Sequence, residues 1–335
     1  MAEVFVGIPT LNRPLLVCES IRSVLNQTYA DLRVVVSDNA SACSAAGQVD
    51  EFVRELRDPR IRFHRQSTNV GEYGQGRYFF RESAGHRYFV ILHDDDVLKP
   101  EHLERAVETL MAHPEASCFV ANPFWMNQRG EISTRETAAY RKRHGRAGRA
   151  EGLFDVLTEH LATGFAPMSG TVFRRDALER SGFVDESCEG NYPFECDLFL
   201  LLGETRAQGW FSPEELLGFR FHSGSMRNYM GLMQNPTVVE RMIYLFSRSR
   251  YSGANERRRR VVLGRLLRAR SVLALRQGDT RAARRALRQS LRENPASLTG
   301  WAIAPLIAAL PSAVSRILPS LPEFTEAPAL PAERQ

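Results

Sequence analysis

The first 120 residues alternate between short runs of strand-forming residues and longer stretches with the spacing of amphipathic helices. Short apolar runs bounded by turn residues indicate strands, and their regular alternation with helical stretches is typical of βα units. In such units, parallel strands form one sheet and helices cover both of its faces. The sequence therefore predicts an α/β fold with a mainly parallel sheet. The strand-like runs are EVFVGI, LRVVVSD, IRFHRQ, RYFVILHD and ASCFVAN.

Polar residues follow the first four of these predicted strands. The carboxyl ends of parallel strands meet at one edge of the sheet, and ligands bind beyond that edge. Loops are generally polar, but that tendency alone does not explain an Asp, an Asn or an acidic cluster at these ends. We therefore predict a binding crevice along this edge. The four segments are residues 9–13, 37–41, 67–71 and 94–96.

Three aspartates, Asp94, Asp95 and Asp96, stand side by side where the fourth strand ends. Carboxylates this close raise one another's pKa unless a cation or several hydrogen-bond donors keep them ionised. The triplet therefore predicts a divalent metal ion with oxygen ligands. The alternative is a structural group of acids before the helix expected near Pro100, where the helix dipole favours negative charge.

Composition restricts the remaining classes. Lysine occurs only at Lys99 and Lys142 among 44 basic residues. Arginine suits bidentate phosphate binding, but the codon bias of a GC-rich genome also raises arginine, so composition identifies no partner. Five cysteines without a CxxC pair indicate reduced thiols. The N-terminus shows no basic leader followed by an apolar core, so we expect a cytoplasmic protein.

The chain beyond residue 230 has a different pattern. Leu and Ala alternate with Arg at helical spacing over residues 257–297, which predicts two antiparallel helices that meet at Gly278 and Asp279. We expect a catalytic domain over 1–230, with a nucleotide-binding half at 1–120 and an acceptor half at 121–230, then a helical region at 231–322 and a disordered tail at 323–335.

Residues 297–322 are apolar for about twenty residues. Pro305, Pro311 and Arg316 interrupt the continuous apolar helix that a membrane span requires. Two placements remain for this segment. It is either a peripheral anchor at the inner face of a membrane, beside the Arg-rich helices, or it packs on the protein's own body.

Six stretches occur along the chain in this order: IPTLNRP, VVVSDNAS, NVG, ILHDDDVLKP, FVDES and FRFHSGSMR. Together they resemble an inverting family 2 glycosyltransferase with the A-type nucleotide-sugar fold, which is built on a Rossmann-like sheet. Each stretch alone is common, so the specificity lies in the ordered set, which spans about residues 3–230. The resemblance implies transfer of a sugar from a UDP-, dTDP- or GDP-linked donor to a hydroxyl of a saccharide, glycolipid or natural-product acceptor.

The resemblance also implies how the donor is bound. Mn²⁺ or Mg²⁺ would hold the diphosphate, with Asp95 as the main metal ligand and Asp96 in a metal-shell or orienting role. Asp94 would contact the ribose or the metal. His222 would close on the metal or the diphosphate, unless it is simply a buried imidazole.

Asp38 would accept a hydrogen bond from the base, because an acceptor-only carboxylate selects a base that presents a donor. Its alternative role is to start a turn after a strand. Ser169 and Gly170 would shape the sugar pocket, and Ser225 and Arg227 would lie in a loop that closes over the donor. The remaining residues implied in nucleotide-sugar binding are Pro9, Thr10, Asn12, Arg13, Asn39, Ser41, Asn69, Gly71 and Arg77.

An inverting transfer needs a carboxylate that takes the proton of the acceptor hydroxyl. In the family this carboxylate belongs to a Glu-Asp pair that opens a helix, and PFECDLFLLL departs from that pattern. The match places the base at Glu195, with Asp197 as the second candidate. For both residues, the alternative role is an N-terminal acid that complements the helix dipole.

Two other classes of function stay open. A nucleotidyl or phosphoryl transferase would use the same crevice and metal, but no GxxxxGK[ST] loop is present and lysine is nearly absent. A catalytically inactive protein would use its Arg-rich helices to bind RNA or anionic lipid. We do not expect nucleic acid as a partner.

Overall fold

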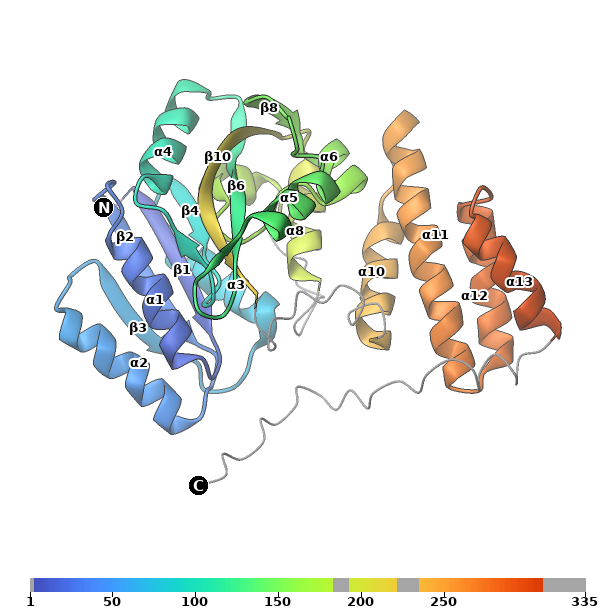
Figure 1. Ribbon diagram of the computed structural model, residues 1–335, viewed down its shortest axis with the longest axis horizontal. Coiled ribbons are helices and arrows are strands. Elements are labelled where there is room, and N and C mark those ends of the chain that lie inside the picture. The colour runs from blue at the N-terminus through green and yellow to red at the C-terminus, as the bar shows by residue number, and fades with distance from the viewer. Residues whose placement is uncertain (1–2, 183–192, 222–234, 310–335) are drawn as a thin grey trace. The chain divides into compact units, whose positions relative to one another are not determined.

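The computed structural model describes residues 3–182, 193–221 and 235–309. Its backbone contacts divide the chain into two compact units, Met1–Gly224 and Ser225–Gln335. The first unit contains the sheet, and the described part of the second unit is helical (Figure 1).

Strands and helices alternate along the first unit. Its strands are β1 (Val4–Thr10), β2 (Leu32–Asp38), β3 (Ile61–Arg65), β4 (Tyr88–Ile91), β5 (Val97–Leu98), β6 (Ala116–Met126), β7 (Ile132–Ser133), β8 (Gly152–Asp155), β9 (Val172–Arg174) and β10 (Gln208–Arg220). Its helices are α1 (Pro14–Leu25), α2 (Cys43–Leu56), α3 (Gly71–Glu82), α4 (His102–Ala112), α5 (Thr134–Arg143), α6 (Val156–Thr163), α7 (Arg175–Arg180) and α8 (Phe194–Glu204).

The strands form one sheet in the order β3-β2-β1-β4-β9-β6-β10-β5, with β7 paired to β6 and β8 to β10. Strands β1 to β4 are parallel to one another, as are β6 and β10, whereas β9 runs antiparallel between β4 and β6. The predicted α/β fold is confirmed. The register sets Thr10 opposite Asp38, so the ends of the first two strands meet at one edge, as expected.

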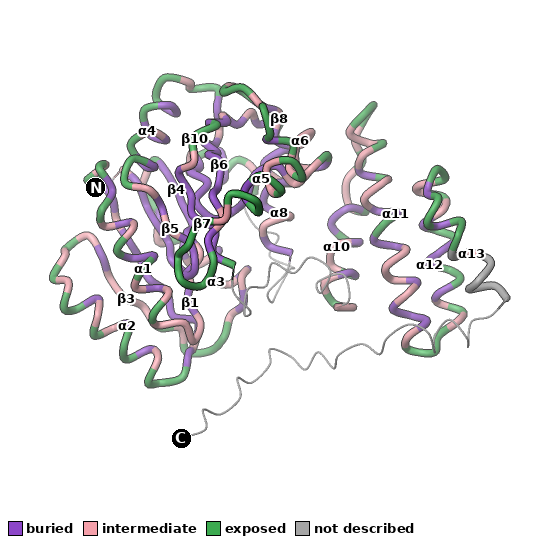
Figure 2. The backbone as a smooth tube through the Cα atoms, in the orientation of Figure 1, coloured by how far each residue is buried: buried purple, intermediate pink, exposed green. Residues whose placement is uncertain are grey.

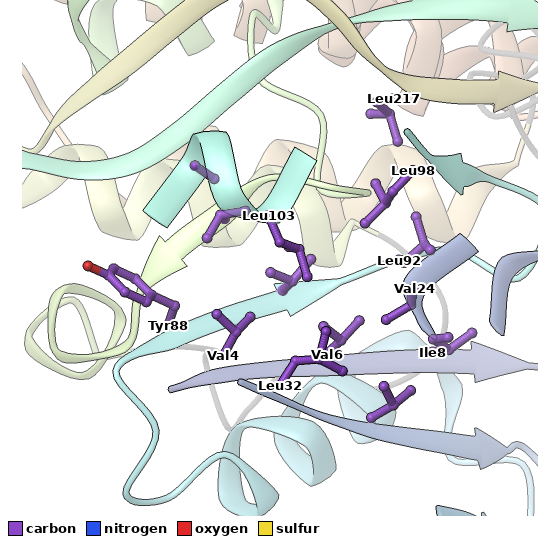
Figure 3. Packing of buried hydrophobic residues seen from close by; sticks show 14 of the residues in the cluster. Val4, Val6, Ile8, Val24, Leu32, Tyr88, Leu92, Leu98, Leu103 and Leu217 are labelled. Carbon is purple, nitrogen blue, oxygen red and sulfur yellow. The ribbon is translucent and has the colours of Figure 1, made fainter. Parts of the chain in front are cut away.

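Both faces of the sheet are buried, because alternate residues of a strand point to opposite sides. On β1, Val6 and Ile8 belong to one hydrophobic core and Phe5 to the other. Figure 3 shows the first core, where Leu103 of α4 and Leu98 of β5 also contribute. In Figure 2 the central strands are buried along most of their length. These two cores fix the strand ends on which the polar loops stand.

Four helices make up the described part of the second unit: α10 (Pro236–Arg248), α11 (Gly253–Arg276), α12 (Thr280–Glu293) and α13 (Leu298–Ala309). Gly278 has a positive φ of 79°, and the Asp279 carboxylate accepts a hydrogen bond from the Ala282 N–H at 2.8 Å. A left-handed glycine ends one helix and an aspartate caps the next. This turn is the one expected between α11 and α12.

None of the described helices has both the length and the apolar character that a membrane span needs. The predicted tail over 323–335 lies outside the described residues.

Candidate active site

The acidic triplet follows β4 directly and is buried, with Asp94 5%, Asp95 6% and Asp96 0% exposed. Thr10 Oγ1 donates to Asp94 Oδ2 at 2.9 Å, and the Arg13 guanidinium donates to Asp94 Oδ1 at 2.9 Å. Burial raises the pKa of Asp94, while the charge of Arg13 opposes this rise. The last residue of β1 and the residue before α1 therefore supply hydrogen-bond donors to Asp94.

Arg220, the last residue of β10, binds both a side chain and a backbone carbonyl of the triplet. Its N–H donates to Asp96 Oδ1 at 3.1 Å, and its Nε donates to the Asp95 carbonyl at 3.1 Å. Its guanidinium also pairs with Glu19 of α1, and only 2% of Arg220 is exposed. Sequence reasoning gave Arg220 no role, although it lies within the FRFHSGSMR stretch.

His93, Asp95 and Asp96 form a group that could hold a metal ion. Each offers one ligand atom, and these atoms lie within 4.8 Å of one another. One imidazole and two carboxylates fit a divalent cation such as Mn²⁺. The sequence analysis assigned no role to His93, although it directly precedes the triplet. The predicted ligand His222 lies outside the described residues, as do Ser225 and Arg227.

Asp38 ends β2 and is 1% exposed. Its Oδ2 accepts a hydrogen bond from the Ser41 N–H at 3.0 Å and faces Arg65 Nε at 3.5 Å. Its Oδ1 is buried and has no hydrogen-bond partner within the described part of the chain. A buried carboxylate oxygen without a donor is costly, so this atom fits a ligand N–H.

Several predicted nucleotide-binding residues bind the loops to one another. Asn12 has a positive φ of 55°, its N–H donates to Ser41 Oγ at 2.8 Å, and its Oδ1 accepts from the Ala42 N–H at 2.8 Å. Asn39 Nδ2 donates to Asn69 Oδ1 at 2.9 Å. The same Asn69 oxygen accepts from the Gly71 N–H at 3.0 Å. These side chains therefore fix the loops after β1, β2 and β3 relative to one another.

Two further predicted residues lie on β1 and on α3. Pro9 lies on β1 opposite Ser37 and is partly exposed. Arg77 lies in the middle of α3 and is partly buried.

Residues 168–170 connect the triplet to helix α8. The Met168 N–H donates to Glu195 Oε1 at 2.9 Å, and Ser169 Oγ accepts from the His93 N–H at 3.1 Å. Gly170 has a φ of 73°, and a Cβ there would come within 2.8 Å of Leu217. Glycine is therefore required at this turn. Neighbouring residues of one loop thus hold both the proposed base and the metal group.

The two candidate bases differ in exposure. Glu195 is partly exposed, whereas Asp197 is 0% exposed and accepts a hydrogen bond from the Tyr73 hydroxyl at 3.3 Å. Both lie in the first turn of α8, where the helix dipole favours acids.

Glu72, in the first turn of α3, is a third acid on this side of the site. Burial and, to a smaller extent, the negative charge of Glu195 together raise the pKa of Glu72 to about 8. Helix α3 contacts α8 here, and the rings of Tyr73 and Phe194 meet edge to face with centroids 5.4 Å apart. Sequence reasoning missed Glu72 because only this helix packing brings it near Glu195.

Comparisons with known proteins agree on one family. The model of "Glycosyl transferase family 2" matches residues 5–182, slightly more than half of the chain. The GalNAc(5)-diNAcBac-PP-undecaprenol beta-1,3-glucosyltransferase of Campylobacter jejuni is 30% identical over 128 residues, which cover 36% of this chain and 39% of that relative. The chain therefore matches about two fifths of the length of that curated relative.

Two solved structures share the fold. S. aureus TarS 1-349 in complex with UDP-GlcNAc has a TM-score of 0.64 at 15% identity, covering 93% of this chain and 88% of that chain. The mannosyltransferase PcManGT from Pyrobaculum calidifontis, in complex with GDP-Man and Mn²⁺, has a TM-score of 0.53 at 18% identity, covering 92% of this chain and 80% of that chain.

Proposed function

The chain belongs to glycosyl transferase family 2, and on that premise we propose that it transfers a sugar from a nucleotide-diphosphate sugar to an acceptor hydroxyl, with inversion at the anomeric carbon. The donor is UDP-, dTDP- or GDP-linked. UDP-GlcNAc and GDP-Man, bound to the two structural neighbours, support this class of donor.

One observation carries the proposal. A continuous series of contacts runs from Glu195 through Met168 and Ser169 to His93, which groups with Asp95 and Asp96. A base and a metal group held by one short loop have a fixed separation. Displacement of a diphosphate by an acceptor hydroxyl on the opposite side of the sugar requires such a fixed separation.

The donor side supports nucleotide binding. Asp38 Oδ1, which has no hydrogen-bond partner among the described residues, would accept a hydrogen bond from the N–H of a uracil, thymine or guanine base. His93, Asp95 and Asp96 would hold Mn²⁺ or Mg²⁺, which when bound supplies positive charge against the diphosphate. Arg13, paired with Asp94, adds a fixed positive charge beside the triplet.

On the acceptor side, Glu195 is the proposed base because it is partly exposed, whereas Asp197 is enclosed. Glu195 takes the proton of the acceptor hydroxyl as its oxygen bonds to the anomeric carbon. The bond from that carbon to the diphosphate oxygen breaks at the same time, and the nucleoside diphosphate leaves. Attack opposite the leaving group inverts the configuration.

The acceptor is proposed to be a saccharide, either carried on a lipid or part of a growing polysaccharide. The name of the Campylobacter jejuni relative gives it an undecaprenol-diphosphate glycan, which supports a lipid-linked acceptor here. A glycosylated natural product is the wider alternative.

The test is a thermal-shift panel of UDP-, dTDP- and GDP-sugars on the full chain, each with and without Mn²⁺. A ligand that binds only the native state raises the melting temperature in proportion to occupancy. We expect at least one nucleotide sugar to stabilise the protein with Mn²⁺ present, and Asp95→Asn to remove the part of the shift that depends on the metal. Failure of every nucleotide sugar to stabilise the wild-type chain would overturn the proposal.

A further inference from the structure

The described part of the second unit is strongly basic. Residues 235–309 contain 16 arginines, no lysine and four acids, a net charge of +12. The whole chain carries +5, so the remaining residues carry −7. A single-sign field of this size on one unit is the electrostatic footprint of an anionic partner.

Each acid of this segment already has a partner within the segment, and for most of them the partner is an arginine of α11. Asp279 caps α12. The other three acids form ion pairs, Glu256 with Arg259 at 2.6 Å, Glu293 with Arg260 at 3.2 Å and Glu240 with Arg270 at 3.3 Å. The three glutamates of this segment are therefore paired with arginines of α11.

Helix α12 carries a row of exposed arginines instead. Arg281, Arg285, Arg288 and Arg292 recur at helical spacing, and none forms an ion pair with the described residues. Together with Arg284 they line a groove of about 610 Å³. The opposite face of α12 is buried through Ala283, Ala286, Leu287 and Ser290. The helix is therefore fixed with its arginines outward, and we call these five residues the arginine row.

The chemistry of the row favours phosphate. A guanidinium binds a phosphate through two parallel N–H donors and gives up its hydration more readily than an ammonium does. A row at successive turns matches many phosphates spread over a surface.

Helix α13 adds an apolar element beside the row. It packs against α12 and has no charged residue. Leu298 in its first turn is 85% exposed and Trp301 is 57% exposed. Exposed tryptophan and leucine in a helical unit rich in arginine are typical of segments that lie at the interface of a bilayer. An uncharged apolar helix suits that interface better than the highly charged groove of a nucleic acid.

We propose that the arginine row, together with Leu298 and Trp301, docks the chain on the surface of an anionic phospholipid bilayer. The arginines bind headgroup phosphates, and the two apolar side chains enter the headgroup region. Such docking is independent of the sugar donor, and it would bring the catalytic unit to any acceptor carried by a membrane lipid.

The test is flotation of the full chain with vesicles of phosphatidylcholine alone or of phosphatidylcholine with 30% phosphatidylglycerol. We expect binding to the anionic vesicles only, weakened by salt. The variant Arg285→Glu/Arg288→Glu should bind about thirtyfold more weakly or worse, from the contribution of each basic residue at an anionic surface. The variant Leu298→Ser/Trp301→Ser should bind several-fold more weakly at high salt as well.

The matched control is Arg129→Glu/Arg135→Glu, which makes the same charge change at exposed positions of the first unit. Its vesicle binding should stay near that of the wild type. An equal loss in both charge-reversal variants would overturn the proposal, and so would absence of vesicle binding. Binding of a single-stranded RNA oligonucleotide that depends on Arg285 and Arg288, without vesicle binding, would assign the row to RNA. Unchanged melting temperatures show that the variants are folded.

Discussion

The proposed donor and acceptor sides of the site use carboxylates in opposite ways. On the donor side, Asp94 and Asp96 accept hydrogen bonds from Thr10, Arg13 and the Arg220 N–H. On the acceptor side, Glu72 lies near Glu195, and burial together with the Glu195 charge raises the pKa of Glu72 to about 8. Hydrogen-bond donors and cations keep carboxylates ionised, as metal ligands must be. A neighbouring acid favours the protonated form, as in a group that holds and transfers protons.

The largest expected effect tests the acceptor side. Glu195→Gln should lower kcat by about a thousandfold, which is the range of a lost general base. The melting-temperature shift given by the nucleotide sugar and Mn²⁺ should remain, because the donor contacts are elsewhere. Asp197→Asn is the control: its enclosed carboxylate should matter less to kcat. Normal turnover in Glu195→Gln would remove it from the mechanism.

The next effect tests the donor side. His93→Ala should weaken Mn²⁺ binding by about a hundredfold, since loss of a direct ligand costs at least as much as loss of its supporting contacts. The preference for Mn²⁺ over Mg²⁺ should also fall, because nitrogen ligands favour transition metals. Calorimetric titration of the full chain with each ion measures both quantities.

His113→Ala at the end of α4 is the matched control and should bind Mn²⁺ normally. If His93→Ala also binds Mn²⁺ normally while His222→Ala does not, the ligand role returns to His222, as the family resemblance implies.

The difference between the sides also explains what the sequence could predict. The donor side is built from consecutive residues that follow consecutive strands, so Thr10, Arg13, Asp38 and the triplet could be read in order. The acceptor side depends on contacts between distant segments. The approach of Glu72 to Glu195 depends on α3 packing against α8, and no local pattern encodes that packing.

Arg220 and β9 illustrate the same limit. Arg220 contacts the triplet across 124 residues of sequence, because β10 pairs antiparallel with β5, which directly follows the triplet. Strand β9 has only three residues, too few to show a period, and its antiparallel place between β4 and β6 is set by its two neighbours. The sequence therefore predicts individual residues on both sides, such as Asp38 and Glu195, but not the contacts that join distant segments.

A smaller effect is expected at Asp38. An amide in Asp38→Asn keeps an oxygen for the Ser41 N–H and presents its NH₂ where Oδ1 stood. Binding of UDP should weaken by about tenfold or more, the cost of a hydrogen bond to a charged group. CDP, whose ring N3 is an acceptor, should lose less. Calorimetric titration with both nucleotides measures the ratio, and an unchanged ratio would separate Asp38 from base recognition.

The smallest effect concerns the pH dependence of stability. The pKa of Glu72 is about 8 in the folded protein and near 4.5 when unperturbed. Between these values the unfolded chain has lost a proton that the folded chain keeps. The stabilising contribution of this group is therefore full below pH 4.5 and is lost as the pH rises through 8.

Glu72→Gln should remove this dependence. The melting temperature of the variant minus that of the wild type should therefore rise between pH 5 and pH 8 and stay constant above pH 8. Glu51→Gln, at an exposed position of α2, is the control and should follow the wild type at every pH. Thermal unfolding from pH 5 to pH 9 without added metal measures the difference. A constant offset between Glu72→Gln and the wild type would mean that Glu72 is ionised across this range, and that the acceptor side resembles the donor side after all.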